Sequence, residues 1–577
     1  MSDEFQVEGK NATAQFTLKL HRGEGMTLLA MNWRAGKPPK DFAGFAMEYK
    51  EPGGDRYYAI KNRIAFPGVL TDEDQPSIST LLAPIQKFRW VHFPRYAHRQ
   101  GLFSYRISPV FMNDKDELSF GEPQEAKIQL HRHTYPGKLN VCFTRGFISS
   151  QAFVKRYAVE GDISSLIPET ADEGLAFKPT HEKAAEAYQW MGFEARAAIL
   201  DTLDEAIAAQ AEVRVIAYDL NQPEIVERLE KLGPRLRIII DDSDKHGKNL
   251  SAESQSARRL MKSAGADHVL RQHMDNLQHN KVIAIRGAGI AKLIYGSTNF
   301  SWRGLYVQSN NAVVVDSQTA VQTCFDAFDE YWSLDAGGFR SATSASSWHS
   351  LGLAGIEARV TYSPHAPANS VLASVASDID AASSSVFFSL AFLGQTTKGP
   401  IGPAIGRAIK KKNLFCLGIS DKQIKAENLG IAVLDSNGKQ KTVSPAALTR
   451  NVPKPFKSEP SGLSGGVGTR MHHKFVVMDF NTDDARVYLG SYNFSEPADD
   501  SNGENLVYIK DRRIATSYMI EALRIFDHYK FRLKQMDAKT KRDKLELQKP
   551  PRKSGEKPWW DEDYKKADKV RDREIFA

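Results

Sequence analysis

The chain has little cysteine and no long apolar run. Its 577 residues include only three cysteines, Cys142, Cys324 and Cys416. Three cysteines are few and odd in number, which excludes a disulfide framework and is typical of a protein from a reducing compartment. The most apolar stretch, residues 386–393, is far shorter than the roughly 20 residues that a membrane-spanning helix needs. The first residues contain neither a basic nor an apolar segment, so we expect no signal peptide and a cytoplasmic location.

Positive charge is concentrated at the C-terminal end. Residues 531–577 hold 15 Lys/Arg against 10 Asp/Glu, which is +5 of the net +7 of the whole chain. Such a tail could dock peripherally on an anionic lipid surface or on nucleic acid. Interleaved acidic residues are more typical of a solvated end. A third alternative is that Trp559 and Trp560 anchor the tail on the folded body.

One segment occurs twice. The first copy has His279-Asn280-Lys281 followed by Gly-Ser-Thr-Asn-Phe-Ser at 296–301, and the second has His472-His473-Lys474 followed by Gly-Ser-Tyr-Asn-Phe-Ser at 490–495. His and Lys two residues apart point to the same face of a strand. The 17 or 18 residues from each His to the following Gly match a hairpin, which would return the Asn to the His and Lys. Two copies therefore predict one site built from two halves.

These side chains suit phosphodiester cleavage without an obligatory metal. The transition state spreads negative charge over the phosphoryl oxygens, so fixed ammonium groups and amide donors stabilise it. One imidazole can attack phosphorus to form a covalent phosphohistidine, while the other protonates the leaving oxygen and then activates water. The motifs contain no clustered carboxylates for a two-metal mechanism, so we expect neither a metal nor a cofactor there.

The second copy resembles the HxKx4D motif of the phospholipase D superfamily, since His472, Lys474 and Asp479 stand at its spacing. The first copy departs from the motif, because Arg286 stands where the family has Asp. In the family this Asp mainly supports the motif, and the tyrosyl-DNA phosphodiesterase branch lacks it. The resemblance covers roughly residues 136–530.

A trailing element also resembles the family. Asn-Gly-Glu at residues 502–504 is similar to the family's N-x-E, in which the Glu orients a catalytic histidine. The first copy has Gln-Ser-Asn at 308–310, so only Glu504 carries over.

The resemblance implies a role for each residue. His279 would be the nucleophile and His472 the acid and base, although the two roles could be exchanged. Glu504 would orient a histidine, and Asp479 would support the motif. The residues that would hold the phosphate or hydrogen-bond within the site are Lys281, Lys474, Asn299, Asn493, Ser297 and Ser491.

Two further segments have alternative interpretations. Asp241, Asp242 and Asp244 with His246 and His273 could suggest a metal site, but their spacing favours a solvated loop. The glycine-rich segment 461–470 could form a lid or be only a linker.

Apolar periodicity predicts the fold. Residues 10–130 alternate with period two, as at Phe16, Leu18 and Leu20, which predicts an N-terminal β-sandwich similar to fibronectin type III or immunoglobulin-like modules. From about residue 136, helical and strand patterns alternate, and the order recurs after residues 336–355. We therefore expect an α/β fold with two phospholipase D-like lobes, each a mixed sheet flanked by helices. The predicted domains are the sandwich at 1–135, the lobes at 136–340 and 341–535, and the basic tail at 536–577.

Three functions remain open. Two motifs in one chain resemble the single-chain phospholipases D and their transferase relatives, which favours a monomeric phosphodiester hydrolase acting on phospholipid. The basic composition and the missing first Asp favour a metal-independent nuclease or a nucleic-acid end-processing phosphodiesterase. Arg286 could instead mark a degenerate, non-catalytic binding scaffold. Head-group specificity, and water or an alcohol as acceptor, stay undecided.

Overall fold

The computed structural model describes residues 4–69, 77–95, 99–131, 133–146, 153, 156–391, 399–425, 428–435, 441–443, 471–540 and 544–577. The glycine-rich segment 461–470 lies outside them. The chain divides into two compact units: the first is Met1–Arg132 with Thr516–Ala577, and the second is His133–Ala515. The four-part division drawn from the sequence stays a prediction.

Two antiparallel sheets form the sandwich of the first unit. One sheet has the order β1-β2-β3-β8, and the other has β10-β9-β4-β5 with β11 beside β9. Their bounds are β1 Gln6–Glu8, β2 Phe16–Arg22, β3 Thr27–Trp33, β4 Phe42–Lys50, β5 Tyr58–Ala59, β8 Arg89–His92, β9 Gly101–Met112, β10 Leu118–Phe120 and β11 Gln124–Leu130, and β6 Lys61–Asn62 pairs with β7 Ile78–Ser79. Phe16, Leu18 and Leu20 are buried, because alternate residues of a strand share one face. The predicted N-terminal antiparallel β region is confirmed.

The C-terminal segment packs into the sandwich core. It contains the end of α14 (Arg512–Thr540), η6 (Asp561–Tyr564) and α15 (Ala567–Glu574). Trp560 and Phe576 are buried, and the indole N–H of Trp559 donates to the carbonyl of Phe42 at 3.1 Å. The guanidinium of Arg89 binds Asp572 at 2.5 Å. Of the three alternatives for the tail, the one observed is that Trp559 and Trp560 anchor it on the folded body.

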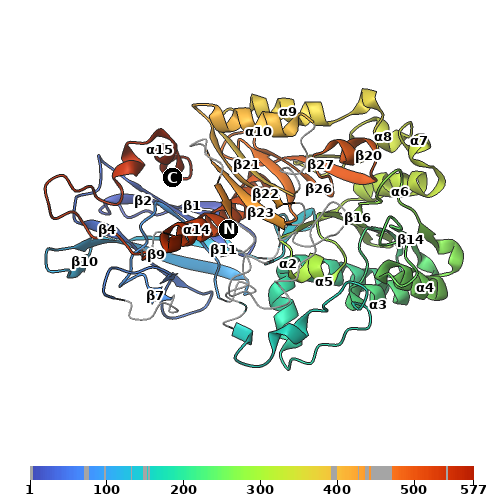
Figure 1. Ribbon diagram of the computed structural model, residues 1–577, viewed down its shortest axis with the longest axis horizontal. Helices are drawn as coiled ribbons and strands as arrows, with labels where there is room; N and C mark the ends of the chain where they lie inside the picture. The colour runs from blue at the N-terminus through green and yellow to red at the C-terminus, as the bar shows by residue number, and fades with distance from the viewer. Residues whose placement is uncertain are drawn as a thin grey trace. The chain divides into compact units, whose positions relative to one another are not determined.

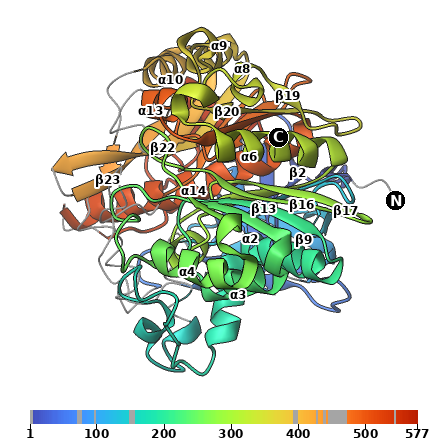
Figure 2. The same cartoon turned by 90° about the vertical axis from the view of Figure 1, so that its right-hand side faces the viewer.

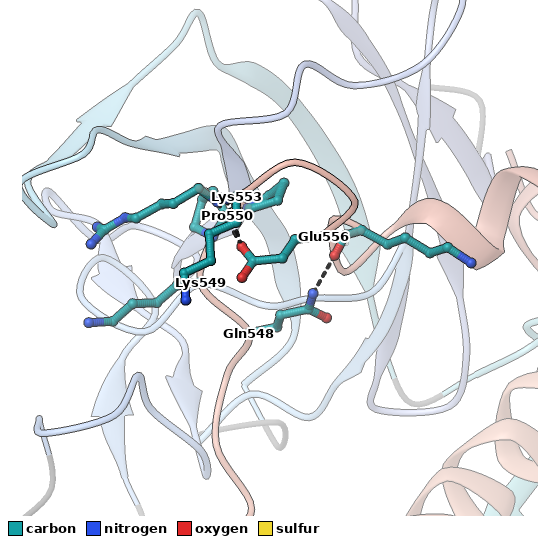
Figure 3. A pocket seen from close by; sticks show the side chains of 8 residues that line it. Gln548, Lys549, Pro550, Lys553 and Glu556 are labelled. Carbon is teal, nitrogen blue, oxygen red and sulfur yellow. Dashed lines mark hydrogen bonds between the residues drawn. The ribbon is translucent and has the colours of Figure 1, made fainter.

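Basic residues of this segment line a shallow surface pocket of about 480 Å³, formed by residues 548–553, 556 and 557 (Figure 3). Lys549 and Arg552 both form ion pairs with Asp116. Glu556 accepts hydrogen bonds from the backbone N–H groups of Arg552 and Lys553. Part of the positive charge is thus neutralised locally, and contact with an anionic surface stays a prediction.

The second unit holds two mixed sheets with the same core order. The first lobe has β12-β18-β17-β16-β13-β14-β15, and the second lobe has β19-β20-β27-β26-β25-β21-β22-β23-β24. Each lobe has one parallel pair at this core, β13–β14 in the first lobe and β21–β22 in the second. The strands that carry the motif are antiparallel in both lobes, β16–β17 in the first and β25–β26 in the second. The predicted duplicated α/β fold is confirmed.

The elements of the first lobe are β12 Leu139–Phe143, η2 Ile163–Leu166, α2 Ala184–Ala208, β13 Glu212–Ala217, α3 Pro223–Leu232, η3 Gly233–Arg235, β14 Leu236–Ile240, α4 Ala252–Ala264, η4 Ala266–His268, β15 Val269–Arg271, β16 Lys281–Gly287, β17 Ile290–Gly296, α5 Trp302–Tyr306, β18 Asn311–Asp316 and α6 Gln318–Ser333. Those that follow are α7 Ala336–Phe339, α8 Thr343–Ser346, β19 His349–Ser350, β20 Glu357–Ser363, η5 Pro367–Asn369, α9 Leu372–Ala381, β21 Ser385–Leu390, α10 Ile401–Lys410, β22 Phe415–Lys425, β23 Asn428–Asp435, β24 Lys441–Val443, β25 Lys474–Met478, β26 Arg486–Gly490, α13 Glu496–Asp500 and β27 Glu504–Lys510.

Helices flank both sheets, and Figures 1 and 2 both place α9 beside α10 in the second lobe and α3 beside α4 in the first. Local sequence explains the start of α3. Pro223 occupies its first turn, and the side chain of Gln222 accepts a hydrogen bond from the N–H of Glu224. No helix in the described part of the chain is long and apolar enough to cross a bilayer.

Candidate functional site

Each motif lies on a hairpin, as predicted. Lys281 begins β16, which pairs with β17, and Lys474 begins β25, which pairs with β26. The returning strands end at Gly296 and Gly490, whose φ values are +145° and +138°. A Cβ at either glycine would lie 2.3 Å from a backbone oxygen of the next strand. Only glycine permits this close approach, which brings the residues that follow it back beside the His and Lys.

The two lobes exchange backbone contacts at the motifs. Gln278, directly before the first His, forms a parallel bridge with Gly503, and Met471, directly before the second His, forms one with Ser309. Each motif of one lobe therefore lies against the trailing element of the other lobe, so the two halves form one site within the second unit.

His279 is paired with a carboxylate. Its Nδ1 lies 2.9 Å from Oε2 of Glu504, and Asn502 donates to the other carboxylate oxygen at 2.9 Å. Both members of the pair are buried, with side chains 5% and 0% exposed. Burial, with the charges of Lys281 and Lys474, lowers the pKa of His279 well below its usual value, and burial raises the pKa of Glu504 to about 8. The free site therefore disfavours charge on both groups.

His472 is paired with an amide. Its Nδ1 lies 2.9 Å from Oδ1 of Asn310 and 3.1 Å from the carbonyl of Ser297. Because both partners are acceptors, Nδ1 carries the proton, and Nε2 is left as the acceptor that Lys474 Nζ approaches to 3.1 Å. Burial and the charges of Lys474 and Lys281 lower the pKa of His472 well below its usual value.

The two imidazoles face each other across a short gap. Their ring centroids are 6.4 Å apart and their planes are inclined by 68°. Each lysine is held by the carbonyl of the histidine two residues before it: Lys281 Nζ donates to His279, and Lys474 Nζ donates to His472 at 2.9 Å. Burial lowers the pKa of Lys281 to about 8, and the carboxylate of Glu504 opposes that shift.

The asparagines and serines of the motifs differ in what they bind. The buried side-chain oxygens of Asn299 and Asn493 receive no hydrogen bond from the residues that the structure describes, so a donor group of a ligand could bind them, whereas phosphoryl oxygens could be bound only by the Nδ2 groups. Ser297 Oγ donates to Asn310 at 2.9 Å, and Ser491 Oγ accepts from the N–H of Asn505 at 3.0 Å. The serines thus tie the trailing elements to the motifs.

Asn310 is a site residue that the sequence analysis missed. It occupies in the first lobe the place that Glu504 occupies in the second, and it binds the histidine of the opposite lobe. The available signal was the position of Gln-Ser-Asn at residues 308–310, which was set aside because it lacks a carboxylate.

Asp479 and Arg286 lie away from the histidines and have different contacts. Asp479 Oδ1 accepts hydrogen bonds from the three successive backbone N–H groups of residues 383–385. Arg286, at the matching position of the first lobe, pairs with Glu212 at 2.8 Å and lies over the ring of Phe325. Its side chain is 42% exposed, so the departure from the motif falls on the surface.

Comparisons with known proteins match both lobes. A family model described as "Cardiolipin synthase, PLD-like domain" matches residues 202–332 and 377–525, and each range contains one copy of the motif. No curated protein matches the chain.

Similar solved structures include polyphosphate kinase from Porphyromonas gingivalis, at 12% identity over 63% of this chain and 51% of that chain, with a TM-score of 0.35. They also include the phospholipase D family member Nuc from Salmonella typhimurium. It matches at 21% identity over 24% of this chain and 86% of that chain, with a TM-score of 0.20. Phosphatidylserine synthase from Haemophilus influenzae Rd KW20 matches at 11% identity over 58% and 85%, with a TM-score of 0.37. The chain thus spans about half the length of the polyphosphate kinase.

Proposed function

Because the chain belongs to the phospholipase D superfamily, we propose that its paired motifs form the active site of a phosphodiesterase that works through a covalent phosphohistidine. The observation that carries the proposal is the pairing of the two histidines. Their rings lie 6.4 Å apart, and each is held through Nδ1, which directs its Nε2 edge away from the supporting residue. One diester phosphorus can then meet a nucleophile and a proton donor together.

His279 is the nucleophile in this proposal. When its Nε2 bonds to phosphorus, the imidazole becomes a cation that still carries the proton on Nδ1. That cation lowers the pKa of Glu504, so Glu504 ionises and its carboxylate, 2.9 Å from Nδ1, stabilises the charged ring, whereas the amide of Asn310 beside His472 supplies no charge. The different partners therefore favour different roles for the two rings.

His472 is the acid and then the base. As the P–Nε2 bond to His279 forms, the bond from phosphorus to the leaving oxygen breaks, and that oxygen takes the proton from Nε2 of His472. Water, or an alcohol, then gives its proton to His472 and attacks phosphorus, and the P–Nε2 bond breaks. The negative charge of a bound diester opposes the effect of Lys474 and Lys281 on His472, so substrate binding raises its pKa toward the protonated state that the first step needs.

The lysines and asparagines stabilise the transition state. Lys281 and Lys474 are fixed by carbonyl groups before substrate arrives, so little reorganisation accompanies the reaction. The side chains of Asn299 and Asn493 supply amide groups to the remaining phosphoryl oxygens.

A covalent trap tests the mechanism. Wild-type protein, His279→Ala and His472→Ala are incubated with a phosphodiester that is labelled in the phosphoryl part and has a nitrophenolate leaving group, which departs without a proton from His472, and are then quenched and digested. The label should accumulate on His279 in the His472→Ala variant, because that variant lacks the base for the second step. His279→Ala should bind substrate but carry no label. Label on His279→Ala, or near wild-type turnover by either variant, would contradict the proposal.

Phospholipid is the substrate class that we favour, and the family model, described as a cardiolipin synthase domain, supports it. The runner-up is nucleic acid, supported by the net charge of +7. Two of the basic side chains of the tail, Lys549 and Arg552, are paired with Asp116, so the local positive charge there is weaker than the tail sequence alone indicates.

Salt dependence separates the two classes. Turnover is measured on mixed phospholipid micelles and on single- and double-stranded DNA at low and high salt. A nucleic-acid enzyme should lose apparent affinity steeply with salt as counterions are released, whereas turnover on lipid should change moderately. Turnover confined to DNA would overturn the phospholipid assignment. Binding without turnover of any diester would favour a non-catalytic scaffold.

A further inference from the structure

Three side chains of metal-ligand type converge in the first lobe, outside the paired motifs. One ligand atom from each of Asp219, His246 and Glu253 lies within 4.8 Å of the other two. Nε2 of His246 is 3.3 Å from Asp219 and 3.9 Å from Glu253. They come from the loop after β13, the loop after β14 and the first turn of α4, so only folding brings them together.

His246 is oriented by a second residue. Its Nδ1 lies 2.8 Å from Oδ2 of Asp241, whose side chain is fully buried. Asp241 is itself fixed, because its Oδ1 accepts from the N–H of Gln278 at 2.7 Å and its Oδ2 accepts from the N–H of Ser243 at 3.1 Å. A carboxylate that holds Nδ1 and directs Nε2 toward other ligand atoms is the usual support of a metal-binding histidine.

Glu253 supplies an independent observation. Its side chain is only 4% exposed, and one carboxylate oxygen accepts from the N–H of Leu220 at 3.1 Å. Its other carboxylate oxygen, Oε2, lies 3.9 Å from Nε2 of His246, which is too far for a hydrogen bond. A carboxylate this deeply buried is costly to ionise, and a cation held between it and His246 would offset that cost. Asp219 is 25% exposed, which leaves an open side for an ion to enter.

We propose that Asp219, His246 and Glu253 bind a divalent transition-metal ion, with Zn²⁺ or Mn²⁺ as the expected occupant. One imidazole and two carboxylates suit these ions, and bonds of about 2.0–2.2 Å require the ligand atoms to close in by roughly 1 Å or less. Without metal, burial lowers the pKa of His246, but the nearby carboxylates of Glu253, Asp219 and Asp241 outweigh it and raise the pKa well above its usual value. A proton and the metal therefore compete for Nε2.

The ion would lie next to the paired histidines but would not take part in the chemistry. The ring of Tyr218 contacts both His246 and His279, at 4.7 Å between centroids in each case. The expected effect of the ion is to join three segments of the first lobe and to hold Tyr218 in place.

Metal binding is measured without substrate, so failure of this test leaves the phosphodiesterase proposal untouched. Full-length protein stripped with EDTA is titrated with ZnCl₂ or MnCl₂ by calorimetry, and Mn²⁺ is also followed by electron paramagnetic resonance. One equivalent should bind saturably, and Zn²⁺ should raise the melting temperature. Glu253→Gln keeps the acceptor for Leu220 but removes the charge, so affinity should fall at least tenfold, on the order of 1.4 kcal/mol.

His273→Gln is the matched control. His273 pairs at 2.7 Å with Asp242, which neighbours Asp241, but it is not one of the three proposed ligands. Its loss should therefore leave the affinity for metal unchanged. Asp219→Asn serves as a second ligand variant at a partly exposed position. Absence of saturable binding by wild-type protein would overturn the proposal. So would unchanged affinity in both ligand variants, or equal weakening in the control.

Discussion

Glu504→Gln is expected to stabilise the protein and to remove its activity. Glu504 is fully buried, and burial raises its pKa from an ordinary 4.5 to about 8. Between these values folded Glu504 holds a proton that the unfolded chain has lost, so the contribution of this group to stability is highest below pH 4.5 and falls as the pH rises to 8. At pH 7 the cost is on the order of 3 kcal/mol.

Glutamine removes this cost and keeps an oxygen that can accept from Nδ1 of His279. The free energy of unfolding should therefore rise by up to about 3 kcal/mol at pH 7 and change little at pH 4. The figure is an upper limit, because Lys281 loses the carboxylate that favours its charged form. Urea unfolding of the two proteins at pH 4 and pH 7 measures the difference.

Turnover should move the other way. A neutral partner cannot balance the charge that develops on the phosphorylated ring of His279, so kcat should fall by roughly 10³–10⁴, as when the carboxylate partner of a catalytic histidine is neutralised. KM should change less, since Glu504 does not face the substrate directly. Both parameters come from a steady-state assay with a chromogenic phosphodiester.

Asn310→Asp is the matched control, because it places a buried carboxylate beside His472 at the equivalent position. It should destabilise the protein increasingly as the pH rises and should raise the pKa of His472. The reasoning is refuted if Glu504→Gln is less stable than wild type at pH 7, if it keeps kcat within tenfold, or if both variants shift stability in the same direction.

Three other outcomes are expected. Lys474→Ala should lower kcat/KM roughly 150-fold, which corresponds to on the order of 3 kcal/mol of lost transition-state stabilisation, because a fixed cation at the phosphoryl oxygens is lost. Kinetics with added methylammonium should show partial rescue. Arg286→Asp should keep kcat/KM within about tenfold of wild type, because that side chain lies on the surface against Glu212; a larger loss would mean that the position matters for the site. Turnover at saturating substrate should survive EDTA, since the paired histidines need no metal; complete loss with rescue by Mg²⁺ would contradict the mechanism.

Local sequence was sufficient for the repeated parts of the fold. Hairpins follow from His-x-Lys and the returning glycine, whose spacing matches two short strands, and β16–β17 and β25–β26 have this form. Helix α3 begins at Pro223 directly after Gln222, whose side chain caps it, so its start is explained by the local sequence. These features depend on neighbours in the chain, and the periodicity of strands and helices records them directly.

Only the tertiary structure decided which partner each histidine has. Glu504 lies 225 residues from His279, and Asn310 lies 162 residues from His472, so no spacing rule connects them. Each pair forms because the trailing element of one lobe packs against the motif of the other. The cluster of Asp219, His246 and Glu253 likewise depends on how two loops and a helix pack together. Packing of the lobes joins residues distant in the chain, whereas a sequence pattern records only near neighbours. This is why the sequence showed the residues of each motif but not which residue of one half contacts which histidine of the other.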